Sequence, residues 1–193
     1  MQKIRSFIAI PLNQEIQTTA ARVVDRLRES ASGVKWVAAD NLHLTLKFLG
    51  DVDNREVPDV CKILRTCCRD VPPFHLTIRG IGGFPDLPRA RVVWAGVEEE
   101  QAVLCSLAES IDQEMGALGF KREFRDYQPH LTLGRLKKGS RLGERFVKAA
   151  QGEAKTMFGH THVQEVHLYA SYLDKQGPTY NVMDRIPLNE AST

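Results

Sequence analysis

The sequence lacks a long hydrophobic run: no segment approaches the roughly 18 consecutive apolar residues of a membrane-spanning helix. The first apolar run, residues 6–11, is too short and too quickly interrupted for a signal peptide, so we expect a buried first strand there. The chain also lacks an excess of charge of one sign, because 26 Lys and Arg face 24 Asp and Glu. Any attraction to nucleic acid must therefore come from a local patch. These absences favour a globular cytoplasmic protein without membrane contact.

Metal and nucleotide signatures are missing as well. The four cysteines, at positions 61, 67, 68 and 105, match no zinc-ligand spacing, and reduced thiols are the default for a cytosolic chain. No Asp, Glu or Cys completes a metal-ligand pattern around His160, His162 and His167, which we interpret as alternating exposed residues. The glycines of residues 80–83 lack the Gly-Lys-Ser/Thr ending of a phosphate-binding P-loop. We therefore expect neither a metal nor another cofactor.

The chain does contain a repeated tetrapeptide. His-Leu-Thr-Leu occurs at residues 43–46 and again at 130–133. Successive side chains of a β-strand point to opposite faces, so the histidine and the threonine share one face and the two leucines share the other. A single strand of this kind is usually only a polar outer face. Two such strands facing each other would place two imidazoles and two hydroxyls around one small target, which suits metal-free acid–base chemistry on a phosphate.

Hydrophobic periodicity predicts an alternating series of strands and helices around these motifs. Expected strands cover residues 4–10, 42–49, 74–81, 91–97, 130–136, 162–173 and 179–186, and expected helices cover 13–31, 54–69, 99–118 and 141–151. Asn13 is placed to cap the first helix. The pattern predicts an α+β fold of two pseudo-symmetric lobes, each a mainly antiparallel sheet with helices on its outer face, with the active-site cleft between them.

The order of the elements indicates that the chain is built twice. The two motifs lie 87 residues apart, and the same shift aligns the apolar faces of the first and third helices, for example Ile16 with Val103. We interpret residues 1–193 as one bilobal domain with an internal duplication, whose halves cover roughly residues 1–88 and 89–193. No low-complexity linker separates the halves.

A near copy of the motif, at residues 75–78, is set apart by the same shift. The shift aligns His75 with His162, and His162 has no threonine two positions later. We therefore interpret these two histidines as solvent-facing residues of outer strands. His43 and His130 remain as the predicted functional pair.

Two segments carry a family resemblance. Residues 41–50, Asn-Leu-His-Leu-Thr-Leu-Lys-Phe-Leu-Gly, and residues 128–135, Gln-Pro-His-Leu-Thr-Leu-Gly-Arg, resemble the paired His-x-Thr-x motifs of the two-histidine (2H) phosphoesterases. Within that superfamily the chain is most similar to the RNA 2′,3′-cyclic phosphodiesterases, also called 2′-5′ RNA ligases. Other segments also resemble this family, namely residues 5–10, 79–85, 91–94 and 168–171 and Trp36. The resemblance spans nearly the whole chain, and the four motif positions show no departure from it.

The resemblance implies hydrolysis of an RNA terminal 2′,3′-cyclic phosphate to a 2′-phosphate end. It implies that His43 is the proton donor to the leaving oxygen and that His130 is the proton acceptor that activates water. The motifs are too symmetric for the residues alone to assign these roles, and the ordinary histidine pKa of ~6.5 suits both. Thr45 and Thr132 share the histidine faces and would donate hydrogen bonds to phosphate oxygens. The reverse reaction, 2′-5′ ligation without ATP, follows from microscopic reversibility.

Two cations are candidates for binding the substrate. Strict alternation puts Arg135 on the leucine face of its strand, but Gly134 can host a bulge that turns it toward the histidine. Lys47 shares the face of the first motif histidine and is expected either to reach the phosphate or to lie at the rim, whereas Phe48 is expected in the core. Residues 119–148 hold nine Lys and Arg against three acids, which predicts either a basic rim for an RNA backbone or a solvated surface.

The residues leave two other functions open. One is a nucleotide- or RNA-binding module that keeps the cleft without physiological catalysis, and measured turnover would distinguish it. The other is a hydrolase of small-molecule cyclic phosphates, which would show no preference for an oligonucleotide. We expect a monomer whose partner is an RNA or oligonucleotide with a 2′,3′-cyclic phosphate end.

Overall fold

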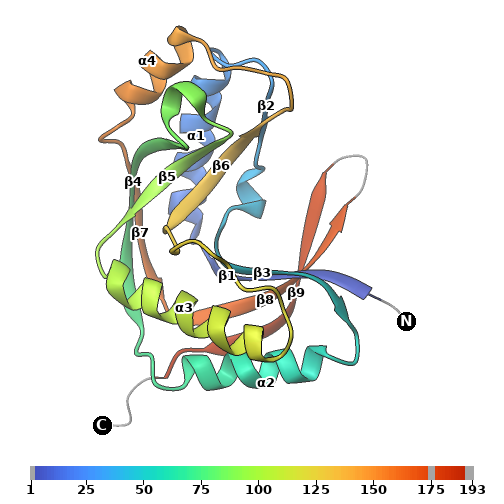
Figure 1. The fold of residues 1–193 in the computed structure, drawn as a ribbon. Coiled ribbons are helices and arrows are strands. Elements are labelled where there is room, and N and C mark those ends of the chain that lie inside the picture. The colour runs from blue at the N-terminus through green and yellow to red at the C-terminus, as the bar shows by residue number, and fades with distance from the viewer. Residues whose placement is uncertain (1–2, 174–176, 190–193) are drawn as a thin grey trace.

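The computed structural model describes residues 3–173 and 177–189, and within them the chain forms two antiparallel sheets and four α-helices (Figure 1). In chain order the elements are β1 (Lys3–Pro11), α1 (Gln14–Arg28), β2 (Val34–Trp36), β3 (His43–Asp53), α2 (Val57–Cys68), β4 (Phe74–Phe84), β5 (Val92–Glu98), α3 (Gln101–Ala117), β6 (His130–Leu136), α4 (Glu144–Gly152), β7 (Met157–Val163), β8 (Glu165–Leu173) and β9 (Pro178–Pro187). The predicted α+β class is confirmed. No helix in the described ranges is both long and apolar enough to cross a membrane.

The two sheets do not coincide with the two halves of the sequence. The first, here called sheet 1, has the order β3-β1-β8-β9, and the second, sheet 2, has the order β2-β6-β5-β4-β7. Sheet 1 therefore takes its last two strands from the C-terminal half, and sheet 2 takes β4 and β2 from the N-terminal half. Each lobe is held together by strands from both halves, which joins the two lobes into one unit.

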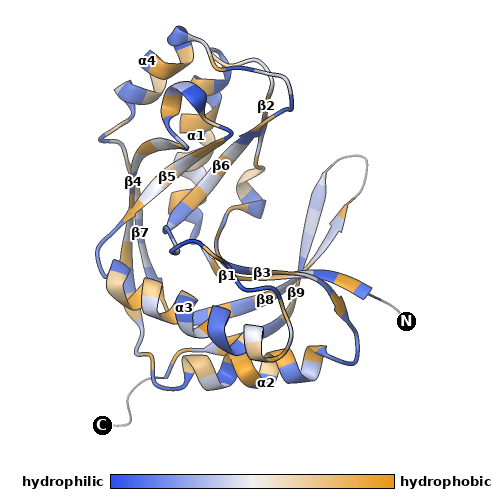
Figure 2. Ribbon diagram, in the orientation of Figure 1, coloured by the Kyte–Doolittle hydropathy of each residue, from blue (hydrophilic) through white to orange (hydrophobic). Residues whose placement is uncertain are grey.

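The helices cover the two sheets in pairs (Figure 1). α2 and α3 pack against each other beside sheet 1, whereas α1 contacts β7 and α4 contacts β4 of sheet 2. The first helix begins as predicted: the Asn13 Oδ1 accepts a hydrogen bond from the backbone N–H of Ile16 at 3.1 Å. Figure 2 shows hydrophobic and hydrophilic residues alternating along α2 and α3, as expected for helices with one buried face.

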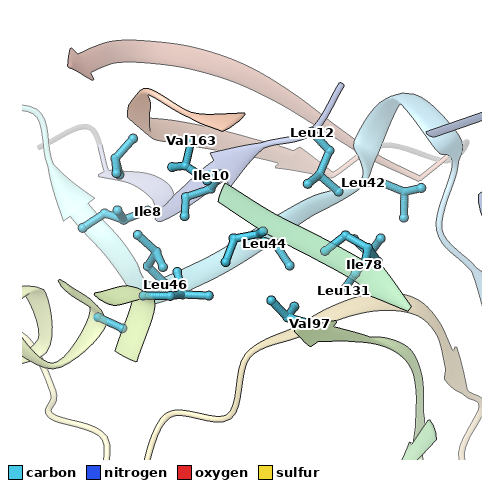
Figure 3. Packing of buried hydrophobic residues seen from close by; sticks show 14 of the residues in the cluster. Ile8, Ile10, Leu12, Leu42, Leu44, Leu46, Ile78, Val97, Leu131 and Val163 are labelled. Atoms are coloured by element: carbon cyan, nitrogen blue, oxygen red, sulfur yellow. The ribbon is translucent and has the colours of Figure 1, made fainter. Parts of the chain in front are cut away.

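The motif leucines lie in the hydrophobic core. Leu44 and Leu131 are both completely buried, and they belong to one cluster that also contains Ile8 and Ile78 (Figure 3). Burial of one face fixes the orientation of the other, because a slip of one residue would exchange the two faces of the strand. The histidine and threonine of each motif therefore point away from the core.

Two strand predictions are corrected by the structure. The three-residue strand β2 was not predicted, and the single strand expected at 162–173 is two strands that meet at Gln164. β7 pairs with β4 in sheet 2, and β8 pairs with β1 in sheet 1, so the chain changes sheets at Gln164. The buried positions shift by one residue at this crossing, from Thr161 and Val163 to Val166 and Leu168, but no Gly or Pro marks it as a turn.

Candidate functional site

The first motif strand bulges directly after its threonine. Thr45 and Lys47 of β3 pair with consecutive residues of β1, so Leu46 is left without a partner between them. A bulge adds one residue to one strand and shifts its alternation of faces by one position. Lys47 therefore points to the buried side with Leu46, and Phe48 takes the side of His43.

The prediction that Lys47 shares the face of His43, either to reach the phosphate or to lie at the rim, is wrong. Its side chain has no exposed surface, and its Nζ donates hydrogen bonds to the Asp112 Oδ1 at 2.5 Å and to the Lys121 carbonyl at 2.8 Å. Although burial acts to raise it, the pKa of Asp112 is lowered by the hydrogen bonds that the carboxylate accepts, the one from Lys47 foremost. Lys47 is thus a structural cation that ties β3 to α3 and to the loop that follows α3.

The prediction that Phe48 belongs to the core is wrong for the same reason. Phe48 is 54% exposed, and its ring centroid lies 6.1 Å from that of Phe7, which packs against His43 at 4.6 Å. Strict alternation fails at both positions because the bulge reverses the faces.

The second motif strand bulges at the equivalent position, as Gly134 suggested. Thr132 and Gly134 pair with consecutive residues of β5, so Leu133 is left over. Arg135 is thereby turned to the face of His130 and is exposed, as predicted. Gly134 takes the buried place that Lys47 has on β3.

Each motif histidine is held by the backbone two residues before it. The Nδ1 of His43 lies 2.7 Å from the Asn41 carbonyl oxygen, and the Nδ1 of His130 lies 2.8 Å from the Gln128 carbonyl oxygen. A carbonyl oxygen can only accept, so Nδ1 carries the hydrogen in both rings. The neutral tautomer then leaves Nε2 with a lone pair, and the protonated ring offers an N–H there. Both imidazoles are prepared to accept or to donate a proton at Nε2.

Burial and one shared positive charge act on the pKa values of both motif histidines. Burial lowers the pKa of His43 to about 4 and also lowers the pKa of His130, and the positive charge of Arg135 lowers both further. The hydrogen bonds to the backbone carbonyls act in the opposite direction but are outweighed. The Arg135 charge also acts on Tyr180, whose ring meets that of His43 edge-on at 5.3 Å. One guanidinium thus acts on both imidazoles, and burial favours the neutral form of each in the free protein.

Aromatic rings enclose His43. Phe7 stacks on Tyr169 with ring centroids 5.0 Å apart, and Tyr180 meets Phe7 edge-on at 4.9 Å. The Tyr169 hydroxyl is also hydrogen-bonded to the His167 Nδ1, with the two atoms 3.0 Å apart. Nothing in the sequence pointed to Tyr180, since its strand carries no motif.

His167 is buried, not exposed as expected. Only 4% of it is accessible, and its Nε2 lies 2.6 Å from the Glu165 Oε1. Glu165, His167 and Tyr169 form a hydrogen-bonded series along one face of β8. The series braces the ring that stacks on Phe7, and it could have been suspected from the i, i+2 spacing of its members.

His130 is flanked by a smaller aromatic group. The Phe84 ring meets the imidazole edge-on at 4.9 Å, and Trp94 lies 5.3 Å from Phe84. Gly82 is required here, because a Cβ at that position would overlap the Trp94 indole. In the described part of the chain, the Trp94 indole N–H is the one buried side-chain donor without a hydrogen-bond partner.

The two motif threonines are half-buried on the faces of their histidines. Within residues 3–173 and 177–189, neither the Thr45 nor the Thr132 hydroxyl has a hydrogen-bond partner. The backbone carbonyl of Thr45 accepts a hydrogen bond from the Tyr127 hydroxyl at 2.9 Å, which ties the loop before β6 to β3. Both hydroxyls are therefore free to donate to a ligand.

The nine cations of residues 119–148 do not form one patch. Three precede β6, Arg135 lies within it, and five follow its other end, so the two outer groups lie at opposite ends of one strand (Figure 1). Of the group before β6, Arg122 is paired with Asp112 at 3.1 Å. The predicted single rim is thus divided, and its larger share lies beside β2 and α4.

The near copy of the motif lies outside this site. His75 and His162 face each other across β4 and β7 as predicted, with exposed rings stacked at 4.3 Å. Thr77 is buried, and its hydroxyl is bonded to the Glu99 Oε2 at 2.6 Å and to the His160 Nδ1 at 2.8 Å. No group of three or more His, Cys, Asp or Glu that could hold a metal occurs in the described ranges.

Comparison with known proteins gives a consistent result. The family model for LigT-like phosphoesterases matches two successive stretches, residues 10–94 and 96–180. An RNA 2′,3′-cyclic phosphodiesterase of Methanothermobacter thermautotrophicus is 37% identical over 182 residues, which cover 94% of this chain and 97% of that protein. A Thermus thermophilus protein of known structure is 29% identical with a TM-score of 0.78, covering 96% of this chain and 98% of that one. E. coli LigT, solved in complex with 3′-AMP, is 28% identical with a TM-score of 0.76, covering 98% of this chain and all of the other.

Proposed function

This chain belongs to the family of LigT-like phosphoesterases, and from that premise we propose that it is an RNA 2′,3′-cyclic phosphodiesterase that works by two-histidine acid–base catalysis without a metal. One observation carries the proposal. His43 and His130 are both anchored through Nδ1 to a backbone carbonyl, neither Nε2 has a partner among the residues that the structure describes, and the charge of Arg135 acts on both rings. Such a pair suits a reaction in which one proton is removed while another is delivered.

In the proposed reaction a water oxygen attacks the phosphorus of the terminal cyclic phosphate. His130 accepts the proton of that water at Nε2, and the bond between phosphorus and the 3′ oxygen breaks. His43 donates its Nε2 proton to the departing 3′ oxygen. The product is an RNA end with a 2′-phosphate and a 3′-hydroxyl, and the two imidazoles have exchanged protonation states. Reversal of these steps, with a 5′-hydroxyl in place of water, would form a 2′-5′ linkage.

The remaining residues stabilise the charge on the phosphate. The free hydroxyls of Thr45 and Thr132 would each donate to a non-bridging oxygen, where negative charge accumulates in the transition state. Arg135 is the cation whose charge lowers the pKa of both histidines. Its guanidinium would neutralise the phosphate without the aid of a metal.

The low pKa of His43, about 4 in the free protein, bears on its role as the proton donor. A ring with this pKa is almost wholly neutral at pH 7, so it must gain its proton when the substrate enters. An anion beside an imidazole favours the charged form and raises its pKa. The bound phosphate therefore raises the pKa of His43 and favours the protonated ring that acts as the acid. Which histidine donates the proton depends on which of them lies next to the leaving oxygen.

The test uses an RNA oligonucleotide that ends in a 2′,3′-cyclic phosphate. We expect turnover in the presence of EDTA and a product with a 2′-phosphate. His43→Ala and His130→Ala should each lower kcat by roughly 10³-fold, the size of an acid–base contribution. His75→Ala is the matched control, since His75 lies in the near copy of the motif on the outer face, and it should retain full activity. Full activity in either motif variant, or dependence on an added metal, would contradict the proposal.

A further inference from the structure

Two cations face each other across the edge of sheet 2. In the antiparallel pairing of β2 with β6, Lys35 lies directly opposite Arg135. Directly opposed residues share one face of a sheet, and their Cβ atoms lie about 4.5–5.5 Å apart. Trp36 and Val34 point the other way, since both would contact a Cβ placed on the buried Gly134. Lys35 therefore shares the face that carries Arg135 and His130.

No counter-charge to this pair occurs among residues 3–173 and 177–189. Like charges directly opposite each other destabilise a sheet. Both side chains are exposed, and in the part of the chain that the structure describes neither forms an ion pair with a carboxylate. Two other strand arginines differ, since Arg185 on the edge strand β9 and Arg79 on the inner strand β4 each lie within 4.0 Å of a glutamate. Two exposed cations side by side, next to the histidines, are suited to bind an anionic ligand.

Lys35 and Arg135 are placed to bind two different phosphates of an RNA substrate. Arg135 lies within electrostatic reach of both histidines, so its partner is the reacting phosphate. Lys35 lies one strand further out, on the edge strand of sheet 2. Beyond it the backbone N–H of Lys137 binds the Gly33 carbonyl at 2.8 Å, which places the start of the larger basic group next to β2. The cations thus form a series that leads away from the site.

We infer that Lys35 binds the backbone phosphate on the 5′ side of the terminal nucleotide, so that the site selects an RNA chain over a cyclic mononucleotide. The inference rests on the proposed function and extends it. A mononucleotide 2′,3′-cyclic phosphate has no such phosphodiester, and Lys35 would contribute nothing to its binding. An RNA chain would enter along the edge of β2 with its backbone toward the cations that follow β6.

A lysine on an edge strand has another use, because a charge there discourages pairing with a strand of another molecule. That role needs no ligand and predicts no effect on substrate binding. It would also be served by a lysine on either face of the strand, whereas here the lysine is placed opposite an arginine.

The experiment compares Lys35→Gln with Lys62→Gln, which removes an equally exposed lysine from the outer helix α2. Binding of an RNA oligonucleotide with a 2′-phosphate end is measured by fluorescence anisotropy over a range of salt concentrations. KM is measured for a 2′,3′-cyclic mononucleotide, for the corresponding dinucleotide and for a longer oligonucleotide. Lys35→Arg, which keeps the charge, tests for rescue.

We expect Lys35→Gln to weaken oligonucleotide binding roughly 3- to 10-fold at low salt and to reduce the slope of log K against log salt by about 1. KM for the mononucleotide should not change, and the loss should appear first at the dinucleotide. Lys62→Gln should behave as the wild type, and Lys35→Arg should restore the slope. Equal losses on mononucleotide and oligonucleotide, or no loss on either, would overturn the inference. Absence of turnover in the wild type would instead reject the proposed function, and the binding slopes would still decide the role of Lys35.

Discussion

The two motif strands, β3 and β6, carry the same four residues in the same arrangement and differ in the two residues that follow. Each histidine is bonded through Nδ1 to a carbonyl two residues earlier, and each strand bulges after its threonine. After the bulge β3 continues with Lys47 and Phe48, and β6 continues with Gly134 and Arg135. The shared part supplies two equivalent imidazoles. The residues that differ give the strands different roles: Lys47 anchors β3 in the protein interior, and Arg135 of β6 places a positive charge at the site.

The surroundings also make the two histidines unequal. His43 lies among Phe7, Tyr169 and Tyr180, and burial lowers its pKa to about 4. The pKa of His130, next to the edge of Phe84, is lowered as well. An identical motif therefore does not dictate an identical acidity, because desolvation is set by the neighbouring strands.

Among the variants that test the difference between the two strands, we expect the largest effect on replacing Lys47. Lys47→Met keeps much of the side-chain volume but leaves the Asp112 carboxylate without its buried partner. Removing one member of a buried pair should lower the free energy of unfolding by about 3 kcal/mol. The kcat and KM of the folded protein should be unchanged, because the side chain points away from His43. Urea unfolding and steady-state kinetics measure the two quantities.

The control for this variant is Lys62→Met on the exposed face of α2, which should alter neither quantity. Normal stability together with a raised KM in Lys47→Met would show that the lysine reaches the phosphate after all. In that case the two strands would not differ in the way the bulge indicates.

The two strands also differ in how much of their geometry could be predicted from the sequence. Alternation along the motif correctly placed His43, Thr45 and the leucines, because period-2 burial holds up to the threonine. It failed one residue later, since a bulge at Leu46 has no glycine to announce it. On β6 the same bulge was foreseen because Gly134 is present. A local signal thus predicted one of two equivalent distortions.

Long-range pairing was beyond the reach of the sequence. Hydrophobic periodicity indicated most strands and helices, but it does not say which strands pair. The exchange of β4 and β8–β9 between the sheets, and the change of sheet at Gln164, depend on contacts between distant segments. The neighbourhood of Tyr180 around His43 follows from that exchange, which is why no motif predicted it.

The threonines test the part that the strands share. Thr45→Val and Thr132→Val remove hydroxyls that have no protein partner in the described residues, so stability should be retained. Each should lower kcat by roughly 10- to 100-fold, as expected for a lost donor to the transition state, and Thr→Ser should restore it. Thr77→Val is the matched control: its hydroxyl is bonded to Glu99 and His160, so it should cost about 1 kcal/mol of stability and no activity. Clearly unequal losses at Thr45 and Thr132 would break the equivalence of the two motifs.

The smallest expected effect is a change in pH dependence on replacing Arg135. Burial, with a further contribution from the Arg135 charge, lowers the pKa of both histidines. Both limbs of the wild-type kcat/KM profile should therefore lie below the ordinary histidine value of ~6.5. Arg135→Met removes a charge that disfavours the imidazolium, so both limbs should move to higher pH while the maximum falls. Arg69→Met, at the end of α2, should leave the profile unchanged. A shift of only one limb would show that Arg135 acts on one histidine alone, and the convergence of the two strands on a single cation would have to be abandoned.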